Sequence, residues 1–190
     1  SEKNISIFVR GAASELARTW SAMQSNVITA ILVIFLLLVI LLKSFSMPFI
    51  ILLVVPVAST GGIAALALLN QFIKQPLDML TMLGFVILTG IVVNNAILLV
   101  EQTILQVKEE GMQIYDAIVE ATRNRIRPIF MSTLTSLFGL IPLVIFPGAG
   151  SELYRGIGVV VFGGLALSTF ATLLIVPPLL SVFSKSIQKN

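Results

Sequence analysis

The stretch that decides the fold runs from Leu77 to Gln102 and reads LDMLTMLGFVILTGIVVNNAILLVEQ. Between Asp78 and Glu101 it holds 22 uncharged residues, enough for a helix to cross the apolar core of a bilayer. Two adjacent amides, Asn94 and Asn95, lie inside this span. A polar side chain at membrane depth is costly unless it faces protein or water. The pattern therefore predicts a membrane helix that turns its amides toward neighbouring protein.

The composition predicts an all-α membrane protein. Of the 190 residues, 57% are hydrophobic and only 11% are charged, and the mean hydropathy is +1.04. An ordinary soluble domain is about a quarter charged, so lipid has to cover much of this apolar surface. A transmembrane barrel would show short alternating segments, whereas the apolar runs here are continuous. The formal charge of +3 is modest and indicates membrane orientation rather than binding of nucleic acid.

The sequence has neither cysteine nor histidine, which limits the chemistry it can perform. Disulfides, thiolate or histidine metal sites and histidine-based catalysis are excluded. No pair of acids lies at membrane depth for aspartyl chemistry. We therefore expect a protein that is not an enzyme and that needs no cofactor or metal.

Five spans are predicted, at about 26–42, 48–69, 79–100, 128–146 and 156–183. Residues 104–127 are more polar, with Ile114, Ile118 and Ala121 on one face, and predict an amphipathic helix at the cytoplasmic membrane surface. Before the first span, Asn4 to Arg10 alternates like a short strand, and residues 12–24 suit an interfacial helix. Residues 1–25 are accordingly predicted to be the end of an outer domain followed by an interfacial helix, and residues 184–190 form a tail.

The basic residues predict the orientation of the spans. One set of loops and the tail carries Lys43, Lys108, Arg123, Arg125, Arg127, Lys185 and Lys189. The opposite loops carry only Lys74 and Arg155. The positive-inside rule then places the tail in the cytoplasm and residues 1–25 outside. Glu152 and Arg155, in the outer loop, are expected to be solvated or bound to another domain.

The polar residues of the third and fourth spans are the candidate site. Gly90 lies one turn from Asn94 and leaves room for a neighbouring helix, and Glu101 lies two turns beyond Asn94 on the same face. The fourth span carries a second polar patch, formed by Ser132, Thr133, Thr135 and Ser136. Ser132 lies at a depth similar to that of Asn94, so a hydrogen bond between the two polar patches is expected. With Asn95, these residues either tie helices together or line a proton or ion path. Neither an amide nor a hydroxyl titrates, so a proton-carrying carboxylate has to come from elsewhere.

Three further residues allow two interpretations each. Arg125, just before the fourth span, is either a topology anchor or part of an ion path. Glu101 is either a helix-end charge among lipid headgroups or a proton relay. Gly61, four residues from Ala65, favours close helix packing over ligand binding.

Several segments resemble one family of transporters. GIVVNNAILLVEQ, RNRIRPIFMSTLTSLFGLIPLVIFPGAGSELYRGIGVVVFGGL and TLLIVPPLL are similar, in that order, to segments of resistance–nodulation–division (RND) efflux transporters. LLLVILLKSFSMPFIILLVVPVASTGG, further upstream, is also similar to that family. The branch resembled is that of the hydrophobe/amphiphile exporters, and the resemblance covers residues 11–183. It implies that the spans form the C-terminal transmembrane half of the RND bundle, with residues 1–25 periplasmic.

The resemblance implies a proton-driven multidrug antiporter of the bacterial inner membrane, with a role in antibiotic resistance. Its implied partners are an aspartate-bearing N-terminal half, two further copies in a homotrimer, a periplasmic adaptor and an outer-membrane channel. Its implied substrates are hydrophobic or amphiphilic small molecules, and membrane lipid surrounds it. By motif, the family's proton-site lysine falls on Asn94, its hydroxyl on Ser132 and its arginine on Arg125. Asn94 cannot replace a switching cation, which is a departure from the family pattern.

Two alternatives keep the same helices but change the activity. One is a related proton-driven exporter of protein or lipid. The other is a structural membrane subunit that stabilises a partner half.

Overall fold

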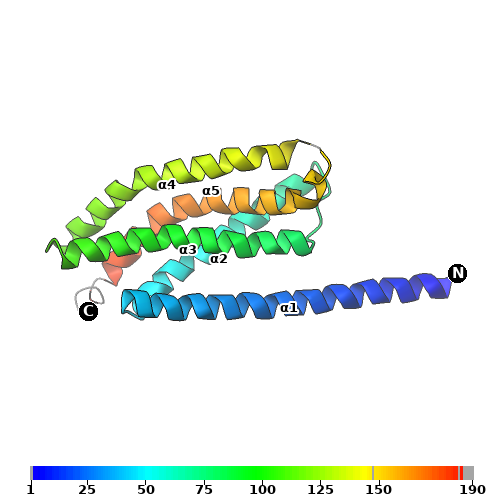
Figure 1. The fold of residues 1–190 in the computed structure, drawn as a ribbon, viewed down its shortest axis with the longest axis horizontal. Helices are drawn as coiled ribbons and strands as arrows, with labels where there is room; N and C mark the ends of the chain where they lie inside the picture. The colour runs from blue at the N-terminus through cyan, green and yellow to red at the C-terminus, as the bar shows by residue number, and fades with distance from the viewer. Residues whose placement is uncertain (1, 147, 184, 186–190) are drawn as a thin grey trace. The chain divides into compact units, whose positions relative to one another are not determined.

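The structure, a computed structural model, describes residues 2–146, 148–183 and 185. The described residues form five helices: α1 (Glu2–Leu42), α2 (Ser46–Asn70), α3 (Met79–Lys108), α4 (Ile114–Ile145) and α5 (Ser151–Val182) (Figure 1). Each helix is long and apolar enough to cross a membrane. These findings confirm the prediction of an all-α membrane bundle.

The first residues of α1 correct one prediction. The alternating segment from Asn4 to Arg10, predicted as a strand, belongs to the helix that begins at Glu2. A single strand leaves its backbone donors and acceptors without partners, whereas a helix pairs them within the segment. Gly11 does not end the segment either, because α1 continues through it into the first span. The predicted interfacial helix and first span are therefore one continuous helix.

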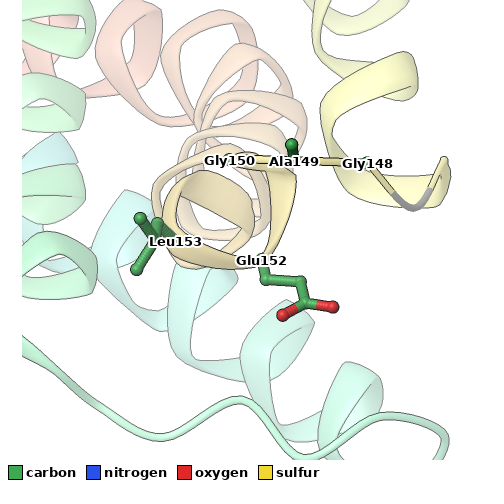
Figure 2. Close-up of a pocket in the computed structure, with 5 residues that line it drawn as sticks. All are labelled: Gly148, Ala149, Gly150, Glu152 and Leu153. Carbon is green, nitrogen blue, oxygen red and sulfur yellow. The ribbon is translucent and has the colours of Figure 1, made fainter.

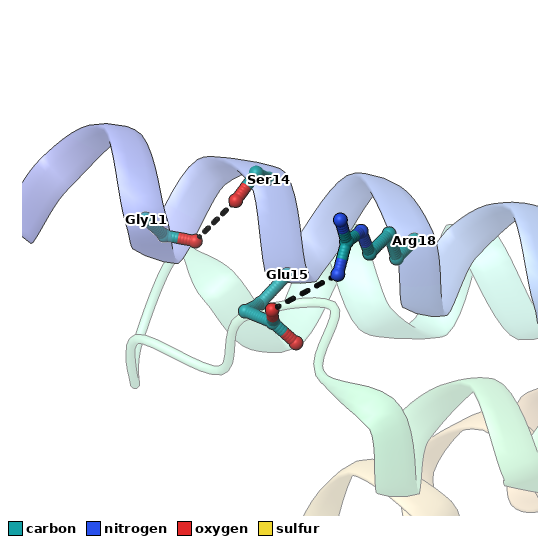
Figure 3. A network of polar contacts seen from close by, with 4 residues as sticks. All are labelled: Gly11, Ser14, Glu15 and Arg18. Carbon is teal, nitrogen blue, oxygen red and sulfur yellow. Dashed lines mark hydrogen bonds and ion pairs between the residues drawn. The ribbon is translucent and has the colours of Figure 1, made fainter.

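Residues 1–36 form a compact unit of their own, apart from residues 37–190. The polar contacts of this unit are local. The Ser14 hydroxyl donates to the Gly11 carbonyl oxygen at 2.8 Å, and Arg18 lies 3.8 Å from the Glu15 carboxylate (Figure 3). Both contacts are exposed, and exposed ion pairs contribute at most about 1 kcal/mol.

In the second unit, α5 is the central helix and packs against α2, α3 and α4. Buried residues occur along its whole length, from Arg155 to Leu180. In contrast, α2 and α4 expose many large apolar side chains, including Phe49 and Phe138. This pattern is expected of a membrane bundle, in which lipid covers the outward-facing apolar side chains.

Glycines allow α2 and α5 to approach each other at backbone distance. A Cβ atom added to Gly163 would lie 2.6 Å from the Gly61 carbonyl oxygen and would overlap the Cβ of Ala65. A Cβ atom on Gly61 would lie 2.7 Å from the Gly163 carbonyl oxygen. Small residues at membrane interfaces permit this close contact, which maximises dispersion attraction between helices. Gly61, predicted as a position of close helix packing, is therefore in direct contact with α5.

The predicted surface helix over residues 104–127 is not a separate element. Its first residues belong to α3, which ends at Lys108, and its remainder is the first half of α4. Pro128 lies inside α4, and Figure 1 shows this helix to be curved. Proline removes one backbone hydrogen bond and bends a membrane helix without ending it. The predicted apolar face is nonetheless present, because Ile118 and Ala121 are buried.

An aspartate fixes the start of α3. Asp78 has extended backbone angles and accepts hydrogen bonds from the Thr81 backbone N–H at 2.8 Å and the Thr81 hydroxyl at 2.6 Å. Such a cap satisfies one of the free N–H groups of the first turn. The Asp78 cap therefore fixes the N-terminal end of α3 at the residue where the uncharged stretch begins.

Candidate functional site

The register of the helices determines which polar residues share a level in the bundle. Gly84 of α3 lies against Ile157 of α5, and Leu88 lies against Gly164, so α3 and α5 run in the same direction. Continuing this register along both helices brings Asn95 to the level of about residues 168–171 of α5, which include Thr169. On the other side, α4 runs antiparallel to α5 and places Thr133 at that level too.

A buried hydrogen bond joins α4 to α5 at this level. The hydroxyl oxygens of Thr133 and Thr169 lie 2.8 Å apart, and the two residues are 4% and 2% exposed. Thr169 also donates to the Leu165 carbonyl oxygen at 2.9 Å. Because a hydroxyl has a single proton to donate, Thr169 accepts from Thr133. The result is a directed chain from Thr133 through Thr169 to the backbone.

Two further hydroxyl residues of α5, Ser168 and Thr172, are each 1% exposed. Ser168 donates to the same carbonyl oxygen of Leu165 at 3.0 Å. The site predicted from the sequence lies on the third and fourth spans and does not include these buried hydroxyls. Their signal was the run Ser168-Thr169 followed by Thr172 one turn later in an otherwise apolar span. Helical spacing places Ser168 and Thr172 on one face.

The two adjacent amides of α3 face opposite surroundings. Asn95 is 8% exposed and lies inside the unit, whereas Asn94 is exposed. Gly90, one turn before Asn94, is also exposed, and nothing lies within 4 Å of a Cβ atom added there. The face of α3 with Gly90 and Asn94 is therefore not covered by α2, α4 or α5. Room for a neighbouring helix is therefore present at Gly90, and none of the described residues of the second unit fills it.

The expected hydrogen bond between the two polar patches is not formed between Asn94 and Ser132. Both side chains are exposed, and neither makes a hydrogen bond to any residue that the structure describes. From the predicted patch of the fourth span it is Thr133 that makes a contact between helices, and its partner is Thr169 of α5 instead of a residue of α3. The reason is the rotation of the helices about their axes. A step of one residue turns a side chain by about 100°, so Thr133 and Asn95 face inward where Ser132 and Asn94 face outward.

Arg125 joins α4 to α3 near the end of the predicted span. Its Nη2 donates to the Gln102 side-chain oxygen at 3.1 Å, and the pair is partly buried. Glu101, the preceding residue, is exposed, and no ion pair to it occurs among the described residues. The arginine thus binds a neutral amide on the neighbouring helix. Arg125 and Gln102 hold α3 and α4 together, and Glu101 remains on the uncovered face.

The chemistry available at this level is hydrogen bonding. The Thr133–Thr169 chain and the amides of Asn94 and Asn95 can donate and accept, but neither kind of group changes its charge near neutral pH. The nearest carboxylate along α3 is that of Glu101, two turns from Asn94. A charge that switches at this depth has to be brought to the uncovered face of α3 by another polypeptide segment.

Comparison with known proteins identifies the family. The sequence profile of the AcrB/AcrD/AcrF family matches residues 3–184. The chain belongs to the AcrB/AcrD/AcrF family. This membership confirms the resemblance to RND efflux transporters.

Some relatives of this AcrB/AcrD/AcrF family chain are named for multidrug resistance, and one is named for swarming motility. The chain is 36% identical over 173 residues to the multidrug resistance protein MdtC of Erwinia tasmaniensis, which covers 89% of the chain. It is 35% identical over 175 residues to MdtC of Salmonella paratyphi A, and 35% identical over 188 residues to the swarming motility protein SwrC of Bacillus subtilis. These alignments cover 92% and 98% of the chain. The chain spans only 16% to 17% of the length of these relatives.

Proposed function

We propose that this chain is the C-terminal transmembrane portion of a proton-driven multidrug efflux antiporter and forms one wall of its proton-translocation site. The observation that carries the proposal is the uncovered face of α3, where Gly90 and the exposed Asn94 lie together. An amide turned toward acyl chains would lose its hydrogen bonds, which costs several kcal/mol in hydrocarbon. A polar partner on that face removes this cost.

The proposed partner is the aspartate-bearing half of the same transporter. An aspartate carboxylate opposite Asn94 would accept a hydrogen bond from the amide when ionised and would donate one when protonated. Asn94 can serve both states because an amide both donates and accepts. This dual capacity replaces the cation that the family pattern places at this position. The Thr133–Thr169 chain and Arg125 support the wall from behind, because they hold α4 against α5 and α3.

The family and the MdtC relatives support drug export as the activity. On this proposal the protein lies in the bacterial inner membrane, with residues 1–25 periplasmic and the C-terminus cytoplasmic. It works as a homotrimer with a periplasmic adaptor and an outer-membrane channel, moves hydrophobic or amphiphilic molecules, and performs no covalent chemistry. Its export contributes to antibiotic resistance.

The experiment is proton-coupled dye efflux by the full transporter carrying Asn94→Ala or Ser132→Ala. We expect Asn94→Ala to lower coupled efflux by about tenfold, the equivalent of one lost hydrogen bond to a charged group of about 1.5 kcal/mol. Asn124→Ala is the matched control, because Asn124 is an exposed amide on α4 outside the apolar stretch. Unchanged efflux by both the Asn94 and the Ser132 variants would remove these residues from the proton site.

A second candidate function is supported by one comparison. The relative from Bacillus subtilis is named for swarming motility. Its alignment covers 98% of the chain at 35% identity, as much of the chain as the alignments with the multidrug resistance proteins or more. The same helical core therefore occurs in a protein named for a different process. A related exporter of protein or lipid would keep the coupling residues and differ in cargo. Efflux that depends on Asn94 in membrane vesicles, but only with a lipid or peptide cargo, would favour this second function.

A further inference from the structure

Arg155 is a buried cation that has no counter-ion within the described residues. It lies in the second turn of α5 and is only 6% exposed. Its Nε atom is shielded from solvent and has no hydrogen-bond partner. No ion pair or hydrogen bond to its guanidinium occurs elsewhere in the described part of the chain. Of the two alternatives predicted for Arg155, solvation is therefore wrong, and binding to another domain stays a prediction.

The two acids nearest in the fold are not its partners. Asp78 is occupied at the start of α3, where its carboxylate accepts two hydrogen bonds from Thr81. Glu152 is exposed, and Figure 2 shows its carboxylate extending away from Leu153 at the rim of a shallow pocket. Neither acid lies within 4.0 Å of the guanidinium. A charge enclosed without a partner costs several kcal/mol.

A second buried polar residue, Gln75, lies at the same end of the unit. Gly156 packs so closely on the start of α3 that an added Cβ atom would overlap the Thr81 hydroxyl and lie 3.1 Å from the Gln75 Nε2. Gln75 is 5% exposed, and its side-chain amide has no hydrogen-bond partner among the residues described. The Arg155 guanidinium has donors only, whereas the Gln75 side chain has two donors and one acceptor oxygen. The chemistry required of a partner at this end is that of an anionic oxygen acceptor.

The surroundings of Arg155 distinguish between kinds of acceptor. A lipid phosphate is bulky and stays in the headgroup layer, whereas a carboxylate on a side chain can enter a narrow opening. Arg155 is only 6% exposed, so little of its surface is open to a partner. The same end of the unit also exposes Phe72 at 79%, Met79 at 66% and Leu153 at 60%. Exposed apolar side chains beside a buried cation give a docking segment apolar contacts as well as an ion pair.

We propose that Arg155, with Gln75 and the loop at residues 71–78, is the docking site for an acidic side chain from another segment of the transporter. The carboxylate forms a buried ion pair with Arg155 and thereby fixes that segment on the outer end of α5. The relatives have room for such a segment, because this chain spans only 16% to 17% of their length. The inference rests on the proposed function only in requiring the complete transporter; proton coupling has no part in it.

The first experiment measures the thermal stability of the detergent-solubilised full transporter with Arg155→Met. Methionine keeps the volume and removes the charge. If a carboxylate pairs with Arg155, the variant leaves that carboxylate buried and unpaired, so we expect its apparent Tm to fall by several degrees. If Arg155 has no partner, the same variant removes an unpaired charge, and its Tm rises. A rise, or no change, overturns the proposal. Lys74→Met is the matched control, because Lys74 is an exposed cation in the same loop.

The second experiment identifies the partner. Tyr154 is half exposed and adjacent to Arg155, so its replacement by the photo-cross-linker benzoylphenylalanine keeps an aromatic ring at that position. Mass spectrometry of the cross-linked transporter should find a peptide that contains aspartate or glutamate. Replacing that acid by leucine in the Arg155→Met background should then restore the lost stability. Cross-links to lipid alone, or no restoration, overturn the proposal. Both readouts are independent of transport, so failure of Asn94→Ala in the efflux assay leaves them unaffected.

Discussion

Replacing Gly163 with alanine tests whether the α2–α5 contact holds the second unit together. The new Cβ atom would lie 2.6 Å from the Gly61 carbonyl oxygen and would overlap the Cβ of Ala65. To restore an ordinary carbon–oxygen separation of about 3.3 Å, the helices have to move apart by about 0.7 Å. A gap of that size removes a quarter to a half of the dispersion energy at each contact. Overpacking of a close interface costs about 1–3 kcal/mol, which is the loss expected for Gly163→Ala.

The assay is unfolding of the full chain in mixed detergent micelles, followed by circular dichroism. Gly139→Ala is the control, because Gly139 lies on α4 and nothing occupies the space within 4 Å of an added Cβ atom. In a helix interior, alanine is favoured over glycine by about 0.5–1 kcal/mol. The two variants should therefore change the unfolding free energy in opposite directions. If Gly163→Ala were as stable as Gly139→Ala, the close approach of α2 and α5 would be refuted.

The remaining predictions concern single polar contacts. Thr133→Val and Thr169→Val, measured separately and together, should give a coupling energy near 0.6 kcal/mol and at most about 1.7 kcal/mol; additive effects in the unfolding assay would contradict the hydrogen bond. Asp78→Ala should destabilise the chain by about 1 kcal/mol through loss of the α3 cap, while Asp78→Asn should recover most of that loss; equal instability of both would contradict capping. Arg125→Ala should remove the hydrogen bond to the Gln102 side-chain oxygen and so increase the exchange rate of the backbone N–H groups in the neighbouring turn of α4. Unchanged exchange of those groups would contradict the contact.

The sequence was sufficient to predict the helices because hydropathy is a property of a continuous segment. The uncharged run after Asp78 begins at the capped start of α3, and the small residues of α2 predicted the contact at Gly61. The predicted family followed from motifs that occur in order along the chain. The ends of the helices were predicted less accurately than the helices themselves. The alternation from Asn4 to Arg10 fits a strand as well as part of a helix, and only the absence of a partner strand distinguishes the two.

The candidate site was predicted from the depth of its residues, and the contacts in the structure differ from those expected. Depth follows from counting residues along each helix, which the sequence permits. Contact depends on the rotation of each helix about its axis, which packing determines. The glycines of α5 bring that helix between α2 and α3, and this packing turns Asn95 and Thr133 inward. Thr133 of the predicted fourth-span patch therefore meets Thr169 of α5, a partner that no pattern in the third or fourth span could have indicated.

The backbone contact between α2 and α5 has a mechanical consequence. Most helix interfaces are separated by side chains, which can change rotamer and allow one helix to slide past the other. At Gly61 and Gly163 no side chain is present, so any sliding would drive one main chain directly into the other. We expect α2 and α5 to move together as one rigid body during a transport cycle. Motion of one helix relative to another is then expected at interfaces formed by side chains. The interfaces of α4 are of this kind, and the membrane half of α4 is largely exposed.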